Sequence, residues 1–504
     1  MRSVSGLEVF RCRPTSPPKA GARLPKAERC CCTMNQTLTR FRACTVAVSA
    51  TLGLVTALAG GATAQTQAVD HATSVHVPCK VKDLVEAINT ANASPGADTL
   101  RLARKCTYKL TSPDTANPAN GLPAITSEIT IDGNGATITR AKSAPDFRIL
   151  LVADTGTLTL NKTTISGGRA TDCPIIPGGA GAVCGGGINN QGTLTVNHSR
   201  VVHNAADSAT DGISVEGGGI DSDGPAATLN DTDVSNNTAI YTGKTAGTAD
   251  GGGIGNDGPL TLNRSRVTNN TVSVTENPDS FAFGAGHAAF ATTTIDHSTI
   301  SDNHASAPGG TARGALSNAV DMKVTDTVIS RNTTSAPRGL ATGGGVANNA
   351  PMRMINTRVI DNTATAAGGT ARGGGIRNGA LGELIMKSSK VLGNTASARG
   401  GTAQGGGIDN PEGGTVTTHR SDISGNTAKA PDGGTAQGGG IYNAAGLTAT
   451  GSTTLNDSTV TDNKASDGGG IFKASGTVTL NNTVVRRNKP NNCAPPNSVP
   501  GCIG

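Results

Sequence analysis

The sequence predicts an all-β fold, a parallel β-helix solenoid with a short N-terminal capping helix. One phrase, Leu-Asn-Asp-Ser-Thr-Val-Thr-Asp-Asn at 455–463, recurs in eleven copies between residues 160 and 488. A second phrase, Gly-Gly-Gly-Ile, alternates with it, for example at 217–220 and 405–408. Self-similarity at roughly 30 residues, built from short β-branched runs, indicates a solenoid in which each repeat forms one turn.

Composition and charge exclude several classes of function. The 504 residues include 69 Gly, no Trp and only three Tyr, which argues against an ordinary globular enzyme and leaves few flat faces for stacking on sugars or bases. The formal charge is +6, but residues 1–64 hold nine Lys and Arg and two acidic residues, so the remainder has a net charge of −1. We therefore expect no nucleic-acid partner.

Residues 1–64 are predicted to be a leader that contains a secretory signal. Arg40 and Arg42 precede an apolar run at 43–59, and Ala-Thr-Ala at 62–64 forms a small-residue cleavage site. Met34 is the expected true start. The apolar run is shorter than the ~20 residues that a membrane span needs, which favours a cleaved signal over a single-pass anchor. We expect no membrane span in the mature chain and a secreted or cell-surface location.

Residues 65–148 are expected to form a cap and the first strands. The apolar residues of 79–93 fall at helical spacing, with Asp83 as candidate N-cap and Pro95-Gly96 as the stop. A helix at this place would cover the open end of the solenoid core, where unpaired backbone groups would otherwise recruit another strand.

The alternation of apolar residues in 149–488 predicts how one turn is built. Positions 3 and 5 of the first phrase, counted from its Leu as zero, should face inward, and positions 2 and 4 outward. The Gly-rich phrase should supply a third strand, giving three strands per turn. The Asn at position 8 is predicted to stack from turn to turn as a buried amide ladder. Its members are Asn204, Asn237, Asn270, Asn303, Asn332, Asn362, Asn394, Asn426, Asn463 and Asn488.

Six cysteines remain beyond the leader, an even number that predicts disulfides in an exported chain. Their positions suggest three local pairs, the last of which closes a tail at 489–504. The pairs are Cys79 with Cys106, Cys173 with Cys184, and Cys493 with Cys502.

The paired Gly-Gly-x-Ile and x-x-Asn phrases resemble the repeats of polymorphic outer-membrane proteins and related adhesin-like proteins. The segment from Cys79 through Leu84-Val-Glu-Ala-Ile88 resembles the N-terminal cap called the CSLREA domain. Together these resemblances cover about residues 79–488. They imply a right-handed parallel β-helix and an adhesion-like function at the cell surface.

Parallel β-helices also carry polysaccharide lyases and glycoside hydrolases, which makes the densest group of carboxylates a candidate catalytic site. This group is Asp221, Asp223, Asp231 and Asp233. Acidic and basic residues alternate from turn to turn in the columns of Asp231 and Asp233, which favours solvent-exposed charge ladders. We therefore expect no catalytic residues, no cofactor and no metal. A polysaccharide-acting enzyme is the alternative, and a bare structural spacer is a third possibility.

One turn is irregular. Residues 281–290 replace a Gly-Gly-Gly-Ile block and contain three of the seven Phe, with His287 at the Ile position. A core plug is the favoured interpretation, and a ligand pocket is the alternative.

Four stretches of Gly-Gly-Thr-Ala follow the Asn of their repeats, at 309–312, 368–371, 400–403 and 433–436. We expect them to be loops at one corner that attach to an extracellular glycan or matrix polymer through many weak contacts. The neighbouring Arg313, Arg372 and Arg399 are the candidate binding residues, since guanidinium groups bind sulfate and carboxylate groups through paired hydrogen bonds. Recent duplication without a selected function is the alternative. The predicted function is thus a secreted or cell-surface protein, adhesion-like or structural, without catalysis.

Overall fold

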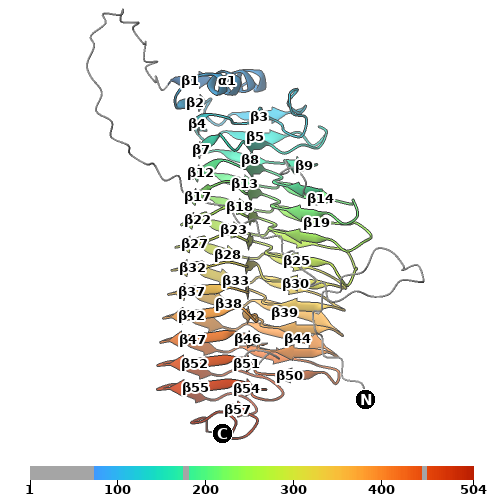
Figure 1. Cartoon of the computed structure of the whole chain (residues 1–504), viewed down its shortest axis with the longest axis vertical. Helices are drawn as coiled ribbons and strands as arrows, with labels where there is room; N and C mark the ends of the chain where they lie inside the picture. Colours follow the sequence, from blue (N-terminus) through green and yellow to red (C-terminus); the bar gives the residue numbers. More distant parts are fainter. Residues whose placement is uncertain (1–72, 174–180, 412, 445–450, 504) are drawn as a thin grey trace, which may run out of the picture. The chain divides into compact units, whose positions relative to one another are not determined.

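A computed structural model describes residues 73–173, 181–411, 413–444 and 451–503. They belong to one compact unit, Ala68–Gly504, and the predicted leader lies outside them. The described chain is a parallel β-solenoid of about eleven turns, preceded by one helix, α1 (Val81–Ala93) (Figure 1). The predicted fold class is confirmed. Within the described residues, no helix has the length and apolar character needed to cross a membrane.

Each central turn contains five short strands rather than the predicted three. In one such turn these are β37 (Pro351–Ile355), β38 (Arg358–Ile360), β39 (Thr363–Ala367), β40 (Thr370–Arg372) and β41 (Ile376–Asn378). Corresponding strands of successive turns pair in parallel and build five sheets, which we number I to V in the order in which the chain visits them. In the described residues they have 14, 13, nine, nine and 12 strands, respectively.

Sheets I, II and V enclose the main apolar core, and sheets III and IV form a side wing (Figure 1). Leu and Val of sheets I and II and the Ile that follows the three glycines line the main core. Ile376, Ile408 and Ile441 pair in register and are buried, which confirms their predicted stacking. The wing has its own core, made almost entirely of Ala, such as Ala364 of β39 and Ala371 of β40.

The Gly-Gly-Thr-Ala stretches are therefore not projecting loops, and that prediction is wrong. Their Thr-Ala pairs begin strands of sheet IV: β30 (Thr311–Arg313), β40, β45 (Thr402–Gln404) and β50 (Thr435–Gln437). Each Ala is buried against sheet III, and only the glycines form turns. Alanine is a weak strand former, but its small side chain lets two sheets pack closely, so tertiary packing overrides the local preference.

The asparagine ladder is present where the chain passes from sheet II to sheet III. The Oδ1 atom of Asn394 accepts hydrogen bonds from the backbone N and the Nδ2 of Asn362, at 2.9 and 3.0 Å. Its own Nδ2 donates to Val359 O and to Oδ1 of Asn426. The same pattern links all ten predicted asparagines from Asn204 to Asn488. The ladder thus satisfies buried backbone groups at the point where the chain leaves the main body.

Both ends of the solenoid core are covered. Helix α1 buries Leu84, Ile88 and Ala91 against the first turn, and β1 (Ser74–Val77) pairs with β2 (Asp98–Leu102). Asp83 lies inside the helix, whose N-cap residue is Lys80 without a side-chain cap, so the predicted N-cap is wrong. At the other end, Val499 of the tail joins the core.

The three disulfides join the pairs expected from the sequence. Cys79 with Cys106 links the cap to the first turn, Cys173 with Cys184 lies at the start of the wing, and Cys493 with Cys502 closes the tail.

We predict that Asn394→Ala lowers the free energy of unfolding by roughly 3 kcal/mol, because it leaves the buried backbone N–H of Asn362 without its acceptor and removes the hydrogen bonds of the amide with Asn362 Nδ2, Val359 O and Asn426 Oδ1. Chemical denaturation measures this loss. The control is Asn263→Ala, which removes a half-buried Asn whose side chain donates to Asn230 at 2.8 Å and should cost about 1 kcal/mol. Equal losses in the two variants would show that the buried ladder has no special role.

Candidate functional site

The wing meets the main body at a re-entrant bend between sheets IV and V. The bend lies at the first glycine of each Gly-Gly-Gly phrase, such as Gly217 with a φ of +57°. An added Cβ at Gly217 would lie 2.5 Å from the Cβ of Asp221, so the residue four positions on points into the inside of the bend. Glycine is required because this left-handed conformation and this close approach both exclude a side chain.

We call the row of side chains on the inside of this bend the corner row. It takes three residues from each turn: the one before the glycines, the second residue of the sheet V strand, and the residue that follows this strand. Successive turns are stacked strands about 4.8 Å apart. The row therefore presents a different chemical group at each step along the solenoid.

The first part of the corner row is acidic. Glu216 ends β15 (Ser214–Glu216), Asp221 lies in the middle of β16 (Ile220–Ser222), and Asp223 follows it. In the next turn, Asp250 ends β20 (Thr248–Asp250) and Asp257 follows β21 (Ile254–Asn256). Glu216 and Asp250 are paired in register, which brings their side chains onto the same face in adjacent turns.

Burial raises the pKa values of all five carboxylates, and repulsion from neighbouring carboxylates adds to this at every one except Asp257. Asp221 and Asp250 are almost completely buried, and removal of water raises the pKa of each well above its ordinary value, with further increases from neighbouring carboxylates. The side chains of Asp223 and Asp257 reach solvent, but the surrounding walls displace much of the water. This desolvation, with repulsion from Asp257, raises the pKa of Asp223 to about 7. Desolvation also raises the pKa values of Glu216 and Asp257.

A buried arginine and a buried asparagine adjoin this acidic part. Arg148 is fully buried and pairs with Asp172 at 2.7 Å, so its charge is already opposed by a carboxylate. Asn189 occupies the same column as Asp221 in the preceding turn, and its Nδ2 donates to Asp221 Oδ2 at 3.0 Å and to Cys184 Sγ at 3.1 Å. The oxygen of this amide is buried and has no hydrogen-bond partner.

The middle of the corner row is aromatic. Phe283 and Phe290, which lie on opposite sides of the bend, pack edge to face with their ring centroids 5.7 Å apart. His287 points instead into the main core, between Ile254 and Leu316, and burial lowers its pKa to about 4. His287 is therefore the predicted core plug, whereas the two Phe are exposed in part on the corner.

The last part of the corner row combines arginines, amides and rings with two carboxylates, Asp409 and Asp467. Arg313 ends β30 and lies over the ring of Phe281, with its Cζ 5.6 Å from the ring centroid. Arg372 ends β40 two turns later, and Arg377 is the middle residue of β41 in the same turn as Arg372. The ring of Phe281 holds the guanidinium group of Arg313 in a fixed plane.

Tyr442 and Phe472 continue this last part of the row in consecutive turns. Their rings are stacked at 5.7 Å with an interplanar angle of 1°. Burial raises the pKa of Tyr442, and the charge of Asp409 raises it further. The charge of Arg372 and a hydrogen bond between the phenol and Gln404 lower it in part. Phe472 is buried beneath this stack, and the ring of Tyr442 is the partly exposed member of the pair.

Two of the three arginines predicted as binding residues lie in the corner row, and the third does not. Arg313 and Arg372 belong to it because Thr-Ala-Arg forms a strand of sheet IV whose third residue faces the bend. Arg399 ends β44 (Thr395–Arg399) in sheet III and pairs with Asp432 on the outside of the wing. The structure thus separates residues that the sequence grouped together.

The four aspartates weighed as a catalytic group are also separated. Asp231 pairs with Arg264 at 2.8 Å and Asp233 with Arg200 at 3.3 Å, on the outer surface where sheets I and II meet. These are the alternating charge ladders expected from the sequence. Asp221 and Asp223 lie at the corner instead, and their partners in the cluster are Glu216, Asp250 and Asp257.

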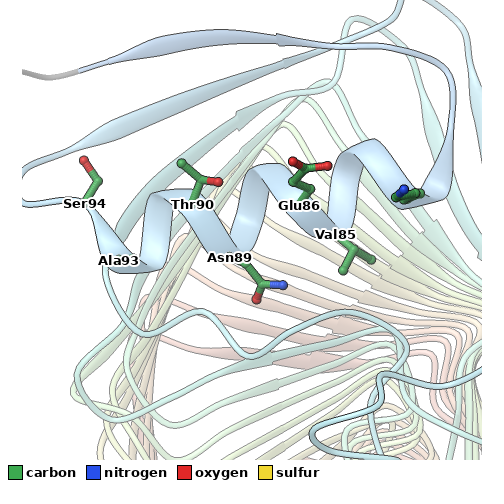
Figure 2. A pocket seen from close by; sticks show the side chains of 7 residues that line it. Val85, Glu86, Asn89, Thr90, Ala93 and Ser94 are labelled. Atoms are coloured by element: carbon green, nitrogen blue, oxygen red, sulfur yellow. The ribbon is translucent and has the colours of Figure 1, made fainter.

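A hollow lies on the outer face of helix α1 (Figure 2). Val85, Glu86, Asn89, Thr90, Ala93 and Ser94 line it, together with Lys82. All of these residues come from one helix and its end, so no second element brings polar groups toward them. A ligand site normally has such convergent polar groups, and the corner row is therefore the stronger candidate.

Comparisons with known proteins give no match. No protein-family model matches the sequence, and neither a curated protein nor a solved structure matches it. The resemblance to outer-membrane protein repeats and to the CSLREA cap therefore stays a prediction.

The sequence contains a signal for the corner row that the phrase alignment missed. Residues 216–223 read Glu-Gly-Gly-Gly-Ile-Asp-Ser-Asp, and residues 250–257 read Asp-Gly-Gly-Gly-Ile-Gly-Asn-Asp. The columns flanking the glycines are thus acidic in two consecutive turns. Without the bend at the glycines, nothing indicates that residues on either side of them face each other.

We predict that the free energy of unfolding rises as the pH falls from 8 to about 6.5. The corner carboxylates have folded-state pKa values above their unfolded values, so the folded protein binds more protons in this range. His287 opposes this gain in stability below about pH 6.5. Its pKa is about 4 in the folded protein, so in this range the histidine is protonated in the unfolded chain but not in the folded one.

Denaturation at a series of pH values measures this slope, and Asp223→Asn should reduce it. A stability that is flat or falls between pH 8 and 6.5 would contradict the predicted pKa shifts.

Proposed function

We propose that this protein is an exported attachment protein that binds an extended acidic polysaccharide along the last part of the corner row. The observation that carries the proposal is the spacing of three partly exposed groups of the corner row, Arg313, Arg372 and Tyr442, which follow one another at intervals of two turns. A β-helix repeats its groups along a line, and an extended glycan repeats its own groups along a line. Several weak contacts then add through effective concentration.

The distribution of charge along the corner row favours binding of an acidic polymer at the arginine-containing end of the row. Guanidinium groups bind carboxylate and sulfate groups through paired hydrogen bonds, and the partly exposed ring of Tyr442 offers apolar surface to a sugar. The carboxylates from Glu216 to Asp257 would repel such a polymer when ionised. Binding is therefore proposed for the turns from Arg313 to Phe472. Export is consistent with the three disulfides, which persist in oxidising compartments.

We predict that Arg372→Ala weakens binding to polygalacturonate at least tenfold, because it removes a charge-assisted hydrogen bond of about 1.5–3 kcal/mol. Tyr442→Ala should weaken binding by loss of the stacking face. Arg399→Ala, which removes an exposed Arg outside the corner row, is the matched control and should bind like the wild type. Titration calorimetry with dextran as the neutral comparison measures the effect. Unchanged binding in both corner variants would place the binding face elsewhere.

A second candidate function, hydrolysis of a polysaccharide, is favoured by one observation. Asp223 combines access to solvent with a pKa raised to about 7, the range that a general acid needs near neutral pH. Its neighbours Asp221 and Asp257 supply further carboxylates in the same corner. Glycoside hydrolases act through a pair of such groups.

For this second candidate we predict release of reducing ends from polysaccharide by the wild type, and a rate lowered about 100-fold or more in Asp223→Asn. Asp302→Asn, in which the changed residue pairs with Arg331 on the outer surface, is the control. Absence of reducing ends across a panel of neutral and acidic polymers would exclude hydrolysis of those polymers and leave attachment as the function.

A further inference from the structure

Sheet I finishes in a strand edge at each end of the solenoid. Among the described residues, its first strand is β1 and its last strand is β55 (Thr477–Asn481), and the two lie at opposite ends of the solenoid (Figure 1). The backbone groups of successive residues in a parallel strand point alternately to its two sides. An edge strand therefore presents part of its N–H and C=O groups to solvent, and such an edge recruits another strand.

At the N-terminal end, the outward backbone groups belong to Ser74 and His76. The carbonyls of Thr73 and Val77 accept hydrogen bonds from the following turn at 2.8 and 3.1 Å. The residues that alternate with them therefore direct their N–H and C=O groups away from the solenoid. These groups are placed to begin a parallel ladder with a further strand.

At the C-terminal end, the outward backbone groups belong to Val478 and Leu480. The N–H of Thr477 donates to the preceding turn and the carbonyl of Asn481 accepts from it, both at 2.9 Å. The tail pairs with sheet V instead, through β57 (Cys493–Ala494). Within the described part of the chain, β55 therefore has a paired strand on one side only.

Helix α1 and the tail cover the ends of the main core only in part. Leu480, and Val485 of β56 (Val484–Arg486), are partly buried, although their register partners in the preceding turn are fully buried. At the other end, Val75 pairs in register with the buried Leu100 and is 43% exposed. All three side chains occupy inward positions of the repeat, so a further turn at either end would bury them.

The N-terminal end carries an acidic groove between β1 and α1. The groove has a volume of about 450 Å³. Its apolar lining includes Val75, Val77, Ala87, Ala91 and Leu100, and its charged lining consists of Asp83, Glu86 and Asp98 with His76. Lys80 and Lys82 are not among the lining residues. The groove therefore suits apolar side chains that are accompanied by positive charge.

The C-terminal end has the opposite charge. Residues 468–504 contain four Lys and Arg and no acidic residue. Arg487 pairs with Asp462 of the preceding turn at 2.7 Å, whereas Arg486 and Lys489 are exposed and have no printed carboxylate partner in the described residues. The two ends of the solenoid are thus complementary in charge as well as in their strand edges.

We propose that this protein assembles head to tail, with the C-terminal end of one copy docked on the N-terminal end of the next. In this arrangement β55 pairs in parallel with β1 of the next copy and continues sheet I across the junction. The strand directions allow it, because β1 and β55 each pair in parallel within the same sheet. Leu480 and Val485 then pack against the groove beside Val75 of the next copy.

Charge favours this contact over contact between like ends, because two C-terminal ends would bring basic residues together. A head-to-tail contact joins two different surfaces, so each added copy leaves one end of each kind available, and the product is a linear filament. The junction uses none of the corner-row residues. The inference therefore does not rest on attachment or on hydrolysis.

The test is sedimentation velocity of the full-length protein over a wide range of concentration, with two variants that each block one end. His76→Pro and Leu480→Pro remove an outward N–H, and proline is tolerated on an edge strand whose N–H faces solvent. We expect the mean mass of the wild type to rise with concentration and each variant alone to stay monomeric. An equimolar mixture of the two variants should form dimers and nothing larger, because only one pair of compatible ends remains.

A charge reversal gives a second measurement that does not alter the strand edge. Arg486→Glu should raise the concentration needed for assembly by about tenfold, because it places a carboxylate opposite the acidic groove. Arg358→Glu changes an exposed Arg of sheet II in a middle turn and is the matched control, which should assemble like the wild type. High salt should weaken assembly of the wild type by screening the attraction between the ends.

A wild type that stays monomeric at every concentration overturns the proposal. Association that persists in both proline variants also overturns it, because the contact would then involve another part of the chain. Dimers formed by one proline variant alone would show contact between like ends and exclude head-to-tail assembly. If a proline variant melts well below the wild type, the charge variants decide, and equal assembly of Arg486→Glu and Arg358→Glu overturns the proposal.

Discussion

The rest of the architecture depends on the buried asparagine ladder. Each asparagine of the ladder is hydrogen-bonded to the turns on either side of it. The ladder lies where the chain leaves the main body after sheet II, a place at which backbone groups would otherwise be buried without partners. Because Asn carries both donors and an acceptor, a stack of Asn satisfies itself and the adjacent carbonyls. The chain can therefore add two further strands per turn without losing register with the main core.

Those two strands form a wing that depends on alanine. Residues such as Ala364 and Ala371 give sheets III and IV a shared core with little volume, and larger side chains would force the sheets apart. The return from the wing to sheet V then requires the sharp glycine bend seen at Gly217. The bend is what brings Glu216 and Asp221 onto one face, so the corner row is a product of the wing rather than of the β-helix itself.

The carboxylates of the corner row differ from those of the outer charge ladders in their exposure to water and in the charge of their neighbours. On the outer surface, Asp231 lies beside Arg264, which lowers the pKa of the aspartate, and such exposed pairs contribute little to stability. In the corner, Asp221 and Asp250 have a raised pKa because water is excluded and the neighbours are also acidic. The same residue type is therefore a solvated surface group in one column and a buried group with a raised pKa in another.

The sequence by itself determined the solenoid, the inward Ile and Val positions, the asparagine ladder and the capping helix, because each is a local pattern repeated at a fixed period. The cysteine pairs were also expected from their spacing. The side wing was not predicted, since Thr-Ala-Thr-Ala has weak strand propensity and forms sheets only when neighbouring turns stack. For the same reason, Arg313, Arg372 and Arg399 were assigned to one binding face although the last belongs to another sheet. Only the tertiary structure decided which carboxylates meet, because the bend at Gly217 and burial by adjacent turns are long-range effects that no single repeat contains.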